Sequence, residues 1–440
     1  MKSNSDRGVS MRAVALAASL CAALYVAVGA QGQAPRYVYD PGWPKPMPNK
    51  WKIGGVTGLA VAPNDDTVWV YDRPNDLTNL ELESEVGVSD CCARPPSMIH
   101  IDKAGNVIGS FDAPQGHGMD IDSKGFAYLG QNTVRKYDTK TGKLVGEIPH
   151  TPELENGGRF GPSEIPTRTP GVGGQGPVAG FLPPPPGAGR GGRGRGANAE
   201  DAAAQTTARA AFRKKYPPTT PMIVGGIEEI RLDEPASEVY VADNYLGGRV
   251  MVFDMNTLAF KRGWGAYGHK LTEISINEAD REFAGDKPPK EFRGHLTLNV
   301  SNDGLVYAAD RAAERIHVTR KDGTFVKEFI VAAPGTRRND SDRGAAGGIA
   351  FSSDRAQRYL YICDIKNNTI WFLNREDGKI AGRVGSMGEN GGQFFGLHMI
   401  ATDSRGYIYT GEVFAGQRVQ RFVPADSPRG KLLEQLTRLQ

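Results

Sequence analysis

The sequence predicts an all-β protein, a six-bladed β-propeller built from four-stranded antiparallel blades. Two observations predict this class: a short pattern recurs along the chain, and turn formers are abundant, with 56 Gly and 29 Pro among 440 residues. The pattern is an apolar stretch, an Asp-x-x-Gly or Asn-Asp-Gly turn, and a β-rich run that ends in an acidic residue. Its copies begin at Gly54, Gly116, Gly226, Gly294, Gly348 and Gly396. Coiled coils avoid Gly and Pro, and disordered chains are poor in apolar residues, which make up 39% here, so the composition excludes both.

Each copy of the pattern predicts the first hairpin of a blade, because alternating apolar and polar residues joined by tight Gly turns are typical of antiparallel strands. A third and a fourth strand follow, as in RVMVFDMNTLAFKRGW. Four short strands about every 40 to 50 residues are typical of a propeller. We expect the propeller to span residues 36–425. The segment Arg36–Asp40 predicts a spare strand that completes the last blade, closes the ring and removes exposed sheet edges.

Residues 1–30 have the pattern of a secretory signal peptide. Basic residues precede an apolar stretch over 13–27, and a small-residue cleavage site ends at Ala30. An uncleaved anchor is the alternative, although the stretch is short for a membrane span. We therefore expect a secreted or periplasmic protein with no membrane contact after cleavage. Cleavage removes three basic residues and one acidic residue, which lowers the formal net charge from +3 to +1, so charge indicates no particular partner.

Residues 151–220 interrupt the repeat between the second and third blades as a low-complexity insert. The insert is rich in Pro, Gly and Arg and carries nine basic and five acidic residues. Its Arg-Gly tract over 190–196 is a kind of segment that can bind RNA, but the composition favours a flexible, solvated loop. We expect no nucleic-acid partner. Ala202–Lys215 predicts a short helix, and residues 426–440 are expected to form a C-terminal tail.

Three cysteines remain once Cys21 has been removed with the signal peptide: Cys91, Cys92 and Cys363. An odd number requires a free thiol or an intermolecular bond. Cys91 and Cys92 could close a vicinal disulfide, or one of them could pair with Cys363, and the sequence leaves both pairings open. No cysteine spacing matches a zinc site.

Three of the seven histidines occupy the same place in the repeat. His117 and His398 each precede the Gly of their turn by eight residues, and His295 precedes its Gly by nine. Each should begin the first strand of its blade, which is the strand that lines the central channel of a propeller. They belong to the second, fourth and sixth blades, so a six-bladed ring would arrange them as a tripod around the axis. The equivalent positions in the other blades are Thr57, Glu228 and Gly347.

A tripod of imidazoles predicts a metal site with one ligand position left open. Three imidazoles that face one point repel one another when protonated, so they are favourable mainly as neutral ligands of a shared cation. Zinc is the first expectation, although imidazole also suits iron, cobalt and copper. The alternative is three unrelated strand histidines. Of the others, His100 and His317 fall in later strands, where a structural role is expected, and His150 and His269 fall in loops.

Three further residues end the second strands of their blades and are therefore expected at the channel mouth. They are Arg73 in VYDRPND, Tyr245 in VADNYLGGRV and Arg311 in AADRAAERI. Two guanidinium groups can bind a carboxylate, and a tyrosine beside a metal can act as a base. The alternative for each is an ordinary surface or packing residue.

The blades resemble NHL repeats, and the set resembles the catalytic core of peptidyl-α-hydroxyglycine α-amidating lyase, also called peptidylamidoglycolate lyase. The likeness runs from about Gly54 to Phe422, except in the insert and the fifth blade. It rests on HGMDIDSKG, HLTLNVSNDG, HMIATDSRG, VADNYLGGRV and ADRAAERI. It implies zinc ligands at His117, His295 and His398, a catalytic tyrosine at Tyr245, and substrate-binding arginines at Arg311 and Arg73.

The resemblance implies a lyase that cleaves the N–Cα bond of a peptidyl-α-hydroxyglycine and releases glyoxylate and a peptide amide. Met399 follows His398 where the family has an acidic residue associated with structural calcium, which argues against calcium here. We expect a monomer that acts on a small carboxylated or peptide substrate. Two alternatives stay open: a non-catalytic propeller that binds a protein, peptide or glycan, and a metal enzyme that hydrolyses a lactone-like ester.

Overall fold

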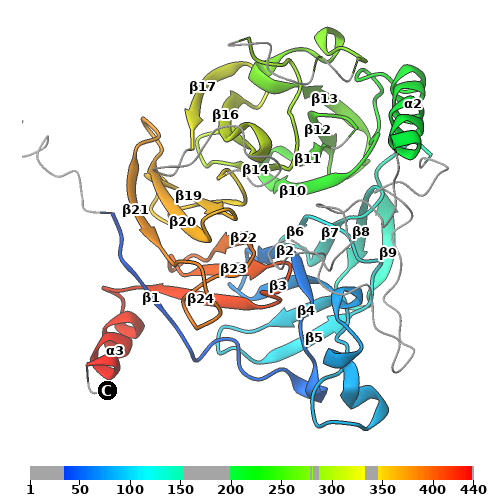
Figure 1. Ribbon diagram of the computed structural model, residues 1–440. Helices are drawn as coiled ribbons and strands as arrows, with labels where there is room; N and C mark the ends of the chain where they lie inside the picture. Colours follow the sequence, from blue (N-terminus) through cyan, green and yellow to red (C-terminus); the bar gives the residue numbers. More distant parts are fainter. Residues whose placement is uncertain are drawn as a thin grey trace, which may run out of the picture. The chain divides into compact units, whose positions relative to one another are not determined.

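The computed structural model describes residues 34–152, 199–244, 246–277, 280, 287–331 and 345–438, with side chains of the helix over 199–215 described from residue 207 onward. Within the unit Arg36–Gln440, the described strands form six four-stranded sheets. Figure 1 shows these sheets arranged as the blades of a propeller. The predicted fold class is confirmed. The signal peptide expected over 1–30 and most of the insert, 153–198, lie outside the described residues.

Each of the first five blades consists of four consecutive strands joined antiparallel. The first three blades contain β2 (Gly55–Val61), β3 (Val68–Arg73), β4 (Met98–Ile101) and β5 (Val107–Phe111); β6 (Met119–Ile121), β7 (Phe126–Gly130), β8 (Val134–Asp138) and β9 (Lys143–Glu147); and β10 (Ile227–Asp233), β11 (Glu238–Asp243), β12 (Arg249–Asp254) and β13 (Phe260–Trp264). The next two contain β14 (Leu296–Val300), β15 (Leu305–Asp310), β16 (Arg315–Arg320) and β17 (Phe325–Ile330); and β18 (Ile349–Phe351), β19 (Tyr359–Asp364), β20 (Thr369–Asn374) and β21 (Ile380–Val384).

The sixth blade joins the two ends of the propeller. It contains β22 (Leu397–Thr402), β23 (Ile408–Glu412), β24 (Val419–Pro424) and, beyond β24, the N-terminal strand β1 (Tyr37–Tyr39). Asp40 directly after β1 binds Arg421 of β24 at 2.7 Å and Arg429 at 2.6 Å. The predicted closure by Arg36–Asp40 is therefore confirmed, and two ion pairs reinforce it.

Helices occur at the margins of the blades. The region expected as a tail, 426–440, contains α3 (Pro428–Thr437), which begins at the N-cap Ser427 and contacts β1 and β24. α2 (Ala199–Lys215) includes the predicted helix Ala202–Lys215. Short 3-10 helices are η1 (Pro48–Lys50), η2 (Pro74–Asp76), η3 (Leu80–Val86), η4 (Glu234–Ala236), η5 (Ala266–Gly268), η6 (Leu271–Glu273) and η8 (Arg311–Ala313). Over the described residues, no helix combines the length and apolar character that a membrane crossing needs.

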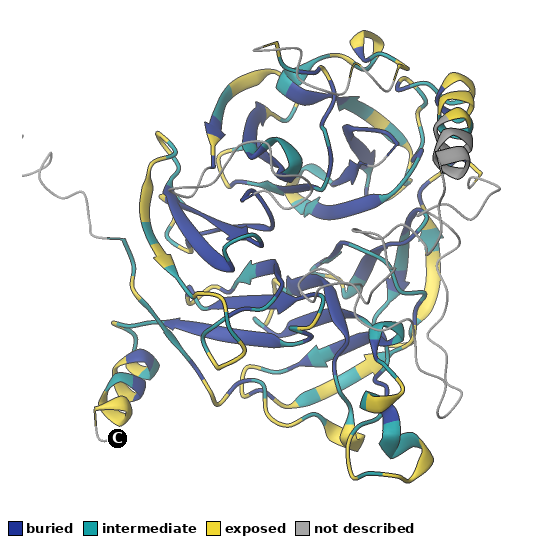
Figure 2. Ribbon diagram, viewed as in Figure 1, coloured by how far each residue is buried: buried dark blue, intermediate teal, exposed yellow. Residues whose placement is uncertain are grey.

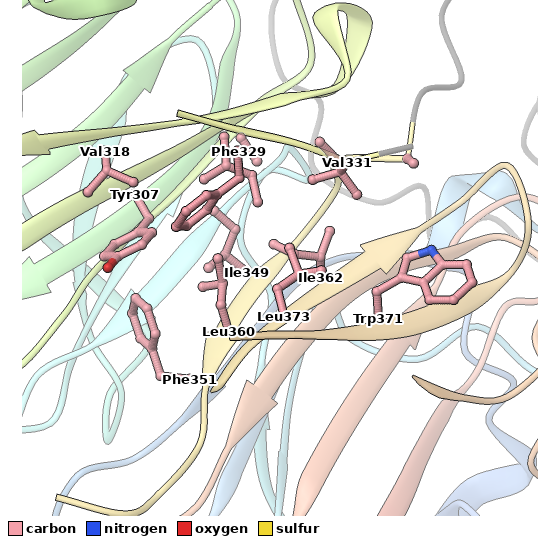
Figure 3. Close-up of a cluster of buried hydrophobic side chains, with 14 residues drawn as sticks. Tyr307, Val318, Phe329, Val331, Ile349, Phe351, Leu360, Ile362, Trp371 and Leu373 are labelled. Carbon is pink, nitrogen blue, oxygen red and sulfur yellow. The ribbon is translucent and has the colours of Figure 1, made fainter. Parts of the chain in front are cut away.

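The hydrophobic core lies between neighbouring blades. In the fourth and fifth blades, Tyr307 and Phe329 face Phe351 and Ile362 in one buried cluster, which Figure 3 shows in close-up. The outer strands β5, β9 and β21 consist of exposed and half-buried residues, whereas the inner strands are mostly buried, as the colours of Figure 2 show. This gradient is what blades that bury both faces against their neighbours require.

Acidic residues at or next to the ends of the second strands accept hydrogen bonds from the segments that lead into the first strands. Asp72 accepts a hydrogen bond from the backbone N–H of Gly54 at 2.7 Å, and Asp310 accepts one from that of Arg293 at 2.7 Å. Asp243 and Glu412 bind the equivalent segments in their own blades. Because these carboxylates hold the chain just before the channel-lining residues, they fix where the first strand begins.

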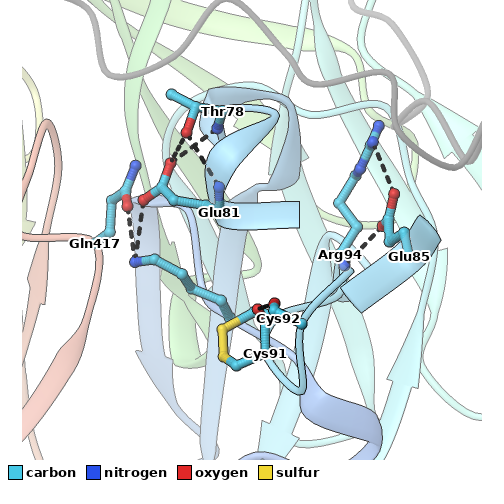
Figure 4. The surroundings of a disulfide bond; sticks show 9 residues. Thr78, Glu81, Glu85, Cys91, Cys92, Arg94 and Gln417 are labelled. Atoms are coloured by element: carbon cyan, nitrogen blue, oxygen red, sulfur yellow. Dashed lines mark hydrogen bonds and ion pairs between the residues drawn. A yellow bond between two sulfur atoms is a disulfide. The ribbon is translucent and has the colours of Figure 1, made fainter. Parts of the chain in front are cut away.

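The cysteines adopt one of the two pairings that the sequence left open. Cys91 and Cys92 form a vicinal disulfide in the loop between β3 and β4, and Cys363 is a buried free thiol in β19. Figure 4 shows the surroundings, including the ion pair between Arg94 and Glu85 at 3.1 Å. The disulfide therefore closes only a local loop, and it links no blades.

Candidate functional site

The first strands β2, β6, β10, β14, β18 and β22 form the inner ring, because each contacts the first strands of both neighbouring blades. The labels of β2, β6, β10, β14 and β22 lie toward the middle of Figure 1. The equivalent positions, all within two residues of the starts of these strands, are Thr57, His117, Glu228, His295, Gly347 and His398. The six positions that the sequence aligned therefore lie around one channel.

Backbone irregularities aim several of these side chains. Thr57, Glu228 and His398 all lie where the pairing of the first and second strands shifts its register. Such β-bulges bend a strand and redirect a side chain. His295 has a φ of +54°, which is uncommon for a residue other than glycine. These features occur in the first strands of three blades and just before that of a fourth, and three of the residues that carry them, Glu228, His295 and His398, belong to one cluster.

Four of the ring side chains meet. Nε2 of His117 lies 2.9 Å from Nε2 of His398 and 3.5 Å from Oε2 of Glu228. The second carboxylate oxygen, Oε1, lies 3.3 Å from Nδ1 of His295. The ligand atoms of His117, Glu228 and His398 all lie within 4.8 Å of one another. The structure thus brings the three predicted histidines together around a carboxylate for which the sequence suggested no role.

Glu228 is a fully buried carboxylate, with 0% of its side chain exposed. No donor among the described residues makes a well-aligned hydrogen bond to either of its oxygens. Burial raises its pKa, but the neighbouring His117 and His295, and then the guanidinium group of Arg311, outweigh burial and hold the pKa below its ordinary value. A buried anion is costly unless hydrogen-bond donors or a cation compensate it, and the nitrogens nearest to Glu228 are those of His295 and His117 at 3.3 and 3.5 Å.

His117 and His398 favour the neutral form. Burial is the main reason that the pKa of His117 is lowered, and burial together with His117 and Arg311 lowers the pKa of His398 well below its ordinary value. Nδ1 of His117 lies 2.6 Å from the main-chain oxygen of Glu228. A carbonyl oxygen can only accept, so Nδ1 carries the proton and Nε2 presents its lone pair to the other ring members.

The two predicted arginines lie near the histidines. Arg73 ends β3, and its guanidinium group binds Asp76 through Nε at 2.9 Å and Nη2 at 2.7 Å. Arg311 begins η8, directly after β15, and its side chain is buried. After burial and Glu228, the charges of Arg73 and Arg311 are further influences on the pKa of His117. Tyr245, the predicted catalytic tyrosine, lies outside the described residues.

The remaining histidines lie apart from this cluster. His100 in β4 stacks on Trp69 with ring centroids 4.1 Å apart, and His317 in β16 is buried against Tyr267 and Phe292. His269 follows η5 and contacts Glu273. The packing roles that the sequence predicted for His100 and His317 are confirmed.

Glu228 is the site residue to which sequence reasoning gave no function. The signal that could have found it was available: Glu228 occupies the histidine position of the third blade, at the start of a buried first strand. A carboxylate at an inward, buried position is rare unless it is paired. The alignment of blades therefore contained a fourth polar channel residue beside the three histidines.

No known family model matches the sequence, and no curated protein matches it. One solved structure that is similar to the chain is that of a structural genomics protein of unknown function from Bacteroides thetaiotaomicron. It has a TM-score of 0.48 and 15% sequence identity, and the match covers 89% of this chain and 76% of that chain. Because that protein's function is unknown, the comparison assigns no activity.

Proposed function

We propose that this protein is a secreted, metal-dependent lyase that cleaves an α-hydroxyglycine-type N–Cα bond with release of glyoxylate, as peptidylamidoglycolate lyase does. The supporting observation is the channel cluster, in which two imidazole Nε2 atoms lie 2.9 Å apart beside a buried carboxylate. A vicinal disulfide and the signal-like pattern over 1–30 support secretion, because disulfides persist in oxidising compartments.

The residues present suit a divalent cation such as Zn²⁺. His117, His398, His295 and Glu228 supply nitrogen and oxygen donors, and imidazole and carboxylate are common zinc ligands. The buried anion of Glu228 has no aligned hydrogen-bond donor among the described residues, and a cation would compensate it. Neutral imidazoles are the form that binds a metal, and burial favours that form here.

The proposed reaction is an elimination in which no group is oxidised or reduced overall. The N–Cα bond breaks as the Cα–O bond becomes a carbonyl, the hydroxyl proton is removed, and the leaving amide nitrogen gains a proton. One peptide amide and one glyoxylate form from each substrate. A bound divalent cation would polarise the hydroxyl or carboxylate oxygen of the substrate.

Side chains of this chain would bind the substrate and move its proton. Arg311 lies beside the histidines and would bind the substrate carboxylate, and Arg73 would add a second guanidinium group whose orientation Asp76 holds. Tyr245 would take the hydroxyl proton, as the family resemblance implies.

The test is glyoxylate release from a short peptide that ends in α-hydroxyglycine, with protein loaded with zinc. We expect release in the wild type and a kcat/KM about 10- to 100-fold lower in Arg311→Gln, because a charge-assisted hydrogen bond is lost. The control is Arg358→Gln, whose side chain is 60% exposed and pairs with Asp354. No release from fully loaded protein would contradict the lyase and favour a non-catalytic propeller.

A further inference from the structure

We infer that the metal is bound by His117, His398 and Glu228, and that His295 is a positioning residue that holds the Glu228 carboxylate. This assignment rests on the proposed metal dependence and names its ligands. It replaces the tripod of three histidines with a set of two histidines and one carboxylate.

The distances between the donor atoms of His117, His398 and Glu228 support this ligand set. Ligands at 2.0–2.2 Å from one ion, at angles between 90° and 110°, lie about 2.8 to 3.6 Å from one another. Nε2 of His117 lies 2.9 Å from Nε2 of His398 and 3.5 Å from Oε2 of Glu228. Both separations from His117 fall in that interval, and the ligand atoms of His398 and Glu228 lie within 4.8 Å of each other, so a small movement of the side chains would let all three bind one ion.

The hydrogen bond of His117 determines which of its nitrogens can bind a metal. Nδ1 of His117 donates to the main-chain oxygen of Glu228 at 2.6 Å, so the lone pair of Nε2 points toward His398 and the carboxylate. Glu228 is fully buried, and its Oε2 faces the same nitrogen. One residue of the third blade therefore orients an imidazole through its carbonyl group and offers its carboxylate beside it. Such an outer hydrogen bond is the usual way a metal-binding histidine is oriented.

His295 has a different position in the cluster. Its Nδ1 lies 3.3 Å from Oε1 of Glu228, which is the carboxylate oxygen farther from the His117 contact. His295 is absent from the group of described donors that lie within 4.8 Å of one another. An imidazole that contacts the second oxygen of a ligating carboxylate fixes its rotation, and the φ of +54° at His295 is a backbone conformation uncommon for a residue other than glycine.

The ligand set changes the chemistry that the site can support. Two histidines and one carboxylate leave the bound ion with a charge one unit lower than three neutral imidazoles would. This set occurs in zinc hydrolases and, with several open positions, in non-haem iron sites. The open positions would accept both the hydroxyl and the carboxylate oxygen of an α-hydroxy acid.

The test compares Glu228→Gln with His295→Asn, because glutamine keeps the shape of glutamate and asparagine tolerates a positive φ. Zinc affinity is measured by competition with a chromophoric chelator, without substrate. We expect Glu228→Gln to bind zinc at least about 100-fold more weakly and His295→Asn about 10-fold more weakly. Matched controls are Glu147→Gln and His269→Asn, both at partly exposed sites.

Near-wild-type zinc affinity in Glu228→Gln would overturn the assignment, and so would a loss of 100-fold or more in His295→Asn. Near-ultraviolet circular dichroism identifies a variant that fails to fold, and Glu228→Asp then replaces it as a charge-retaining test with an intermediate loss expected. The visible spectrum of the Co²⁺-loaded protein adds a readout, because it should change in Glu228→Gln and stay constant in His295→Asn. Glyoxylate release is a separate assay, so failure of the lyase reaction and failure of this ligand assignment give different results.

Discussion

The main-chain oxygen of Glu228 accepts a hydrogen bond from Nδ1 of His117 at 2.6 Å, while the carboxylate of the same residue lies 3.5 Å from Nε2 of that ring. One residue of the third blade therefore contacts both nitrogens of a histidine in the second. The carbonyl group fixes the tautomer, and the carboxylate lies beside the exposed lone pair. The boundary between these two blades thus decides the geometry of the site.

Gly118 makes that close approach possible, and its replacement should disturb the site. A Cβ atom at this position would lie 2.8 Å from Cα of Glu229 and 3.0 Å from the main-chain oxygen of Glu228, and φ is +78°. Gly118→Ala should lower the free energy of unfolding by about 2 kcal/mol and zinc affinity by about 10-fold, as measured by urea titration and chelator competition.

The matched control is Gly125→Ala, where φ is +84° but the nearest atom lies at 3.5 Å. Gly125→Ala introduces the same kind of backbone strain as Gly118→Ala, but its Cβ atom clashes with no neighbouring atom. Equal zinc affinities in the two variants would show that the approach of the blades at Gly118 does not govern the site.

Closure of the propeller depends on Asp40. Its carboxylate binds Arg421 and Arg429 and is fully buried. Asp40→Ala leaves the buried Arg421 without its carboxylate partner, so we expect the free energy of unfolding to fall by about 3 kcal/mol. Removing Glu434, whose partner Arg36 is 70% exposed, should cost less than about 1 kcal/mol. Denaturant unfolding of both variants measures the difference, and equal effects would contradict the role of Asp40.

His317 should make the protein less stable in mild acid. Burial lowers its pKa to about 4 from an ordinary value of 6.5, and neither ring nitrogen has a hydrogen-bond partner among the described residues. A depressed histidine pKa means that the unfolded chain takes up the proton first as pH falls. The stability that neutral His317 contributes is therefore complete above pH 6.5 and is lost progressively as the pH falls toward 4.

The variant that isolates this effect is His317→Phe, since Tyr267 and Phe292 already surround the ring. Its free energy of unfolding relative to wild type should rise by about 2 kcal/mol between pH 8 and pH 5. The charges of Glu328 and Arg315 also influence the pKa of His317. The variant and the wild type are therefore compared at the same pH in otherwise identical protein. A difference that does not change with pH would contradict a neutral, buried His317.

Thiol labelling checks the cysteine arrangement. Without denaturant, Cys363 should resist alkylation because it is fully buried. Apart from Cys21, unfolding without reductant should expose one thiol per chain, and unfolding with reductant should expose three, because Cys91 and Cys92 are paired. Peptide mass spectrometry assigns the sites. A cross-link that includes Cys363 would contradict the vicinal pairing.

Most of the fold could be predicted from the sequence, because the same turn residues recur in each blade. The spare strand at Arg36–Asp40 could be matched to the last blade, which otherwise lacks its fourth strand. Helix α3 escaped prediction, since its ten residues show no long periodic pattern and depend on contacts with β1 and β24. The cysteine pairing could not be predicted, because three cysteines are compatible both with a bond between Cys91 and Cys92 and with a bond from either of them to Cys363.

At the site, the repeat register indicated that the three histidines lie at or near the starts of inner strands, but it could not reveal how they meet. The contacts of Glu228 depend on a bulge in β10, and those of His295 on a left-handed backbone conformation. Neither feature follows from strand periodicity, which assumes regular pleating. Sequence spacing therefore predicted a symmetric tripod, whereas the folded chain places a carboxylate between two of its members.

The central claim, a metal centre at the channel mouth, is tested most directly by metal content. Purified protein is loaded with zinc, dialysed and measured by plasma mass spectrometry beside the double variant His117→Ala, His398→Ala. We predict one ion per chain in the wild type and none in the variant. Protein that retains no zinc or other transition metal after loading, or a variant that retains as much as the wild type, would contradict the metal centre.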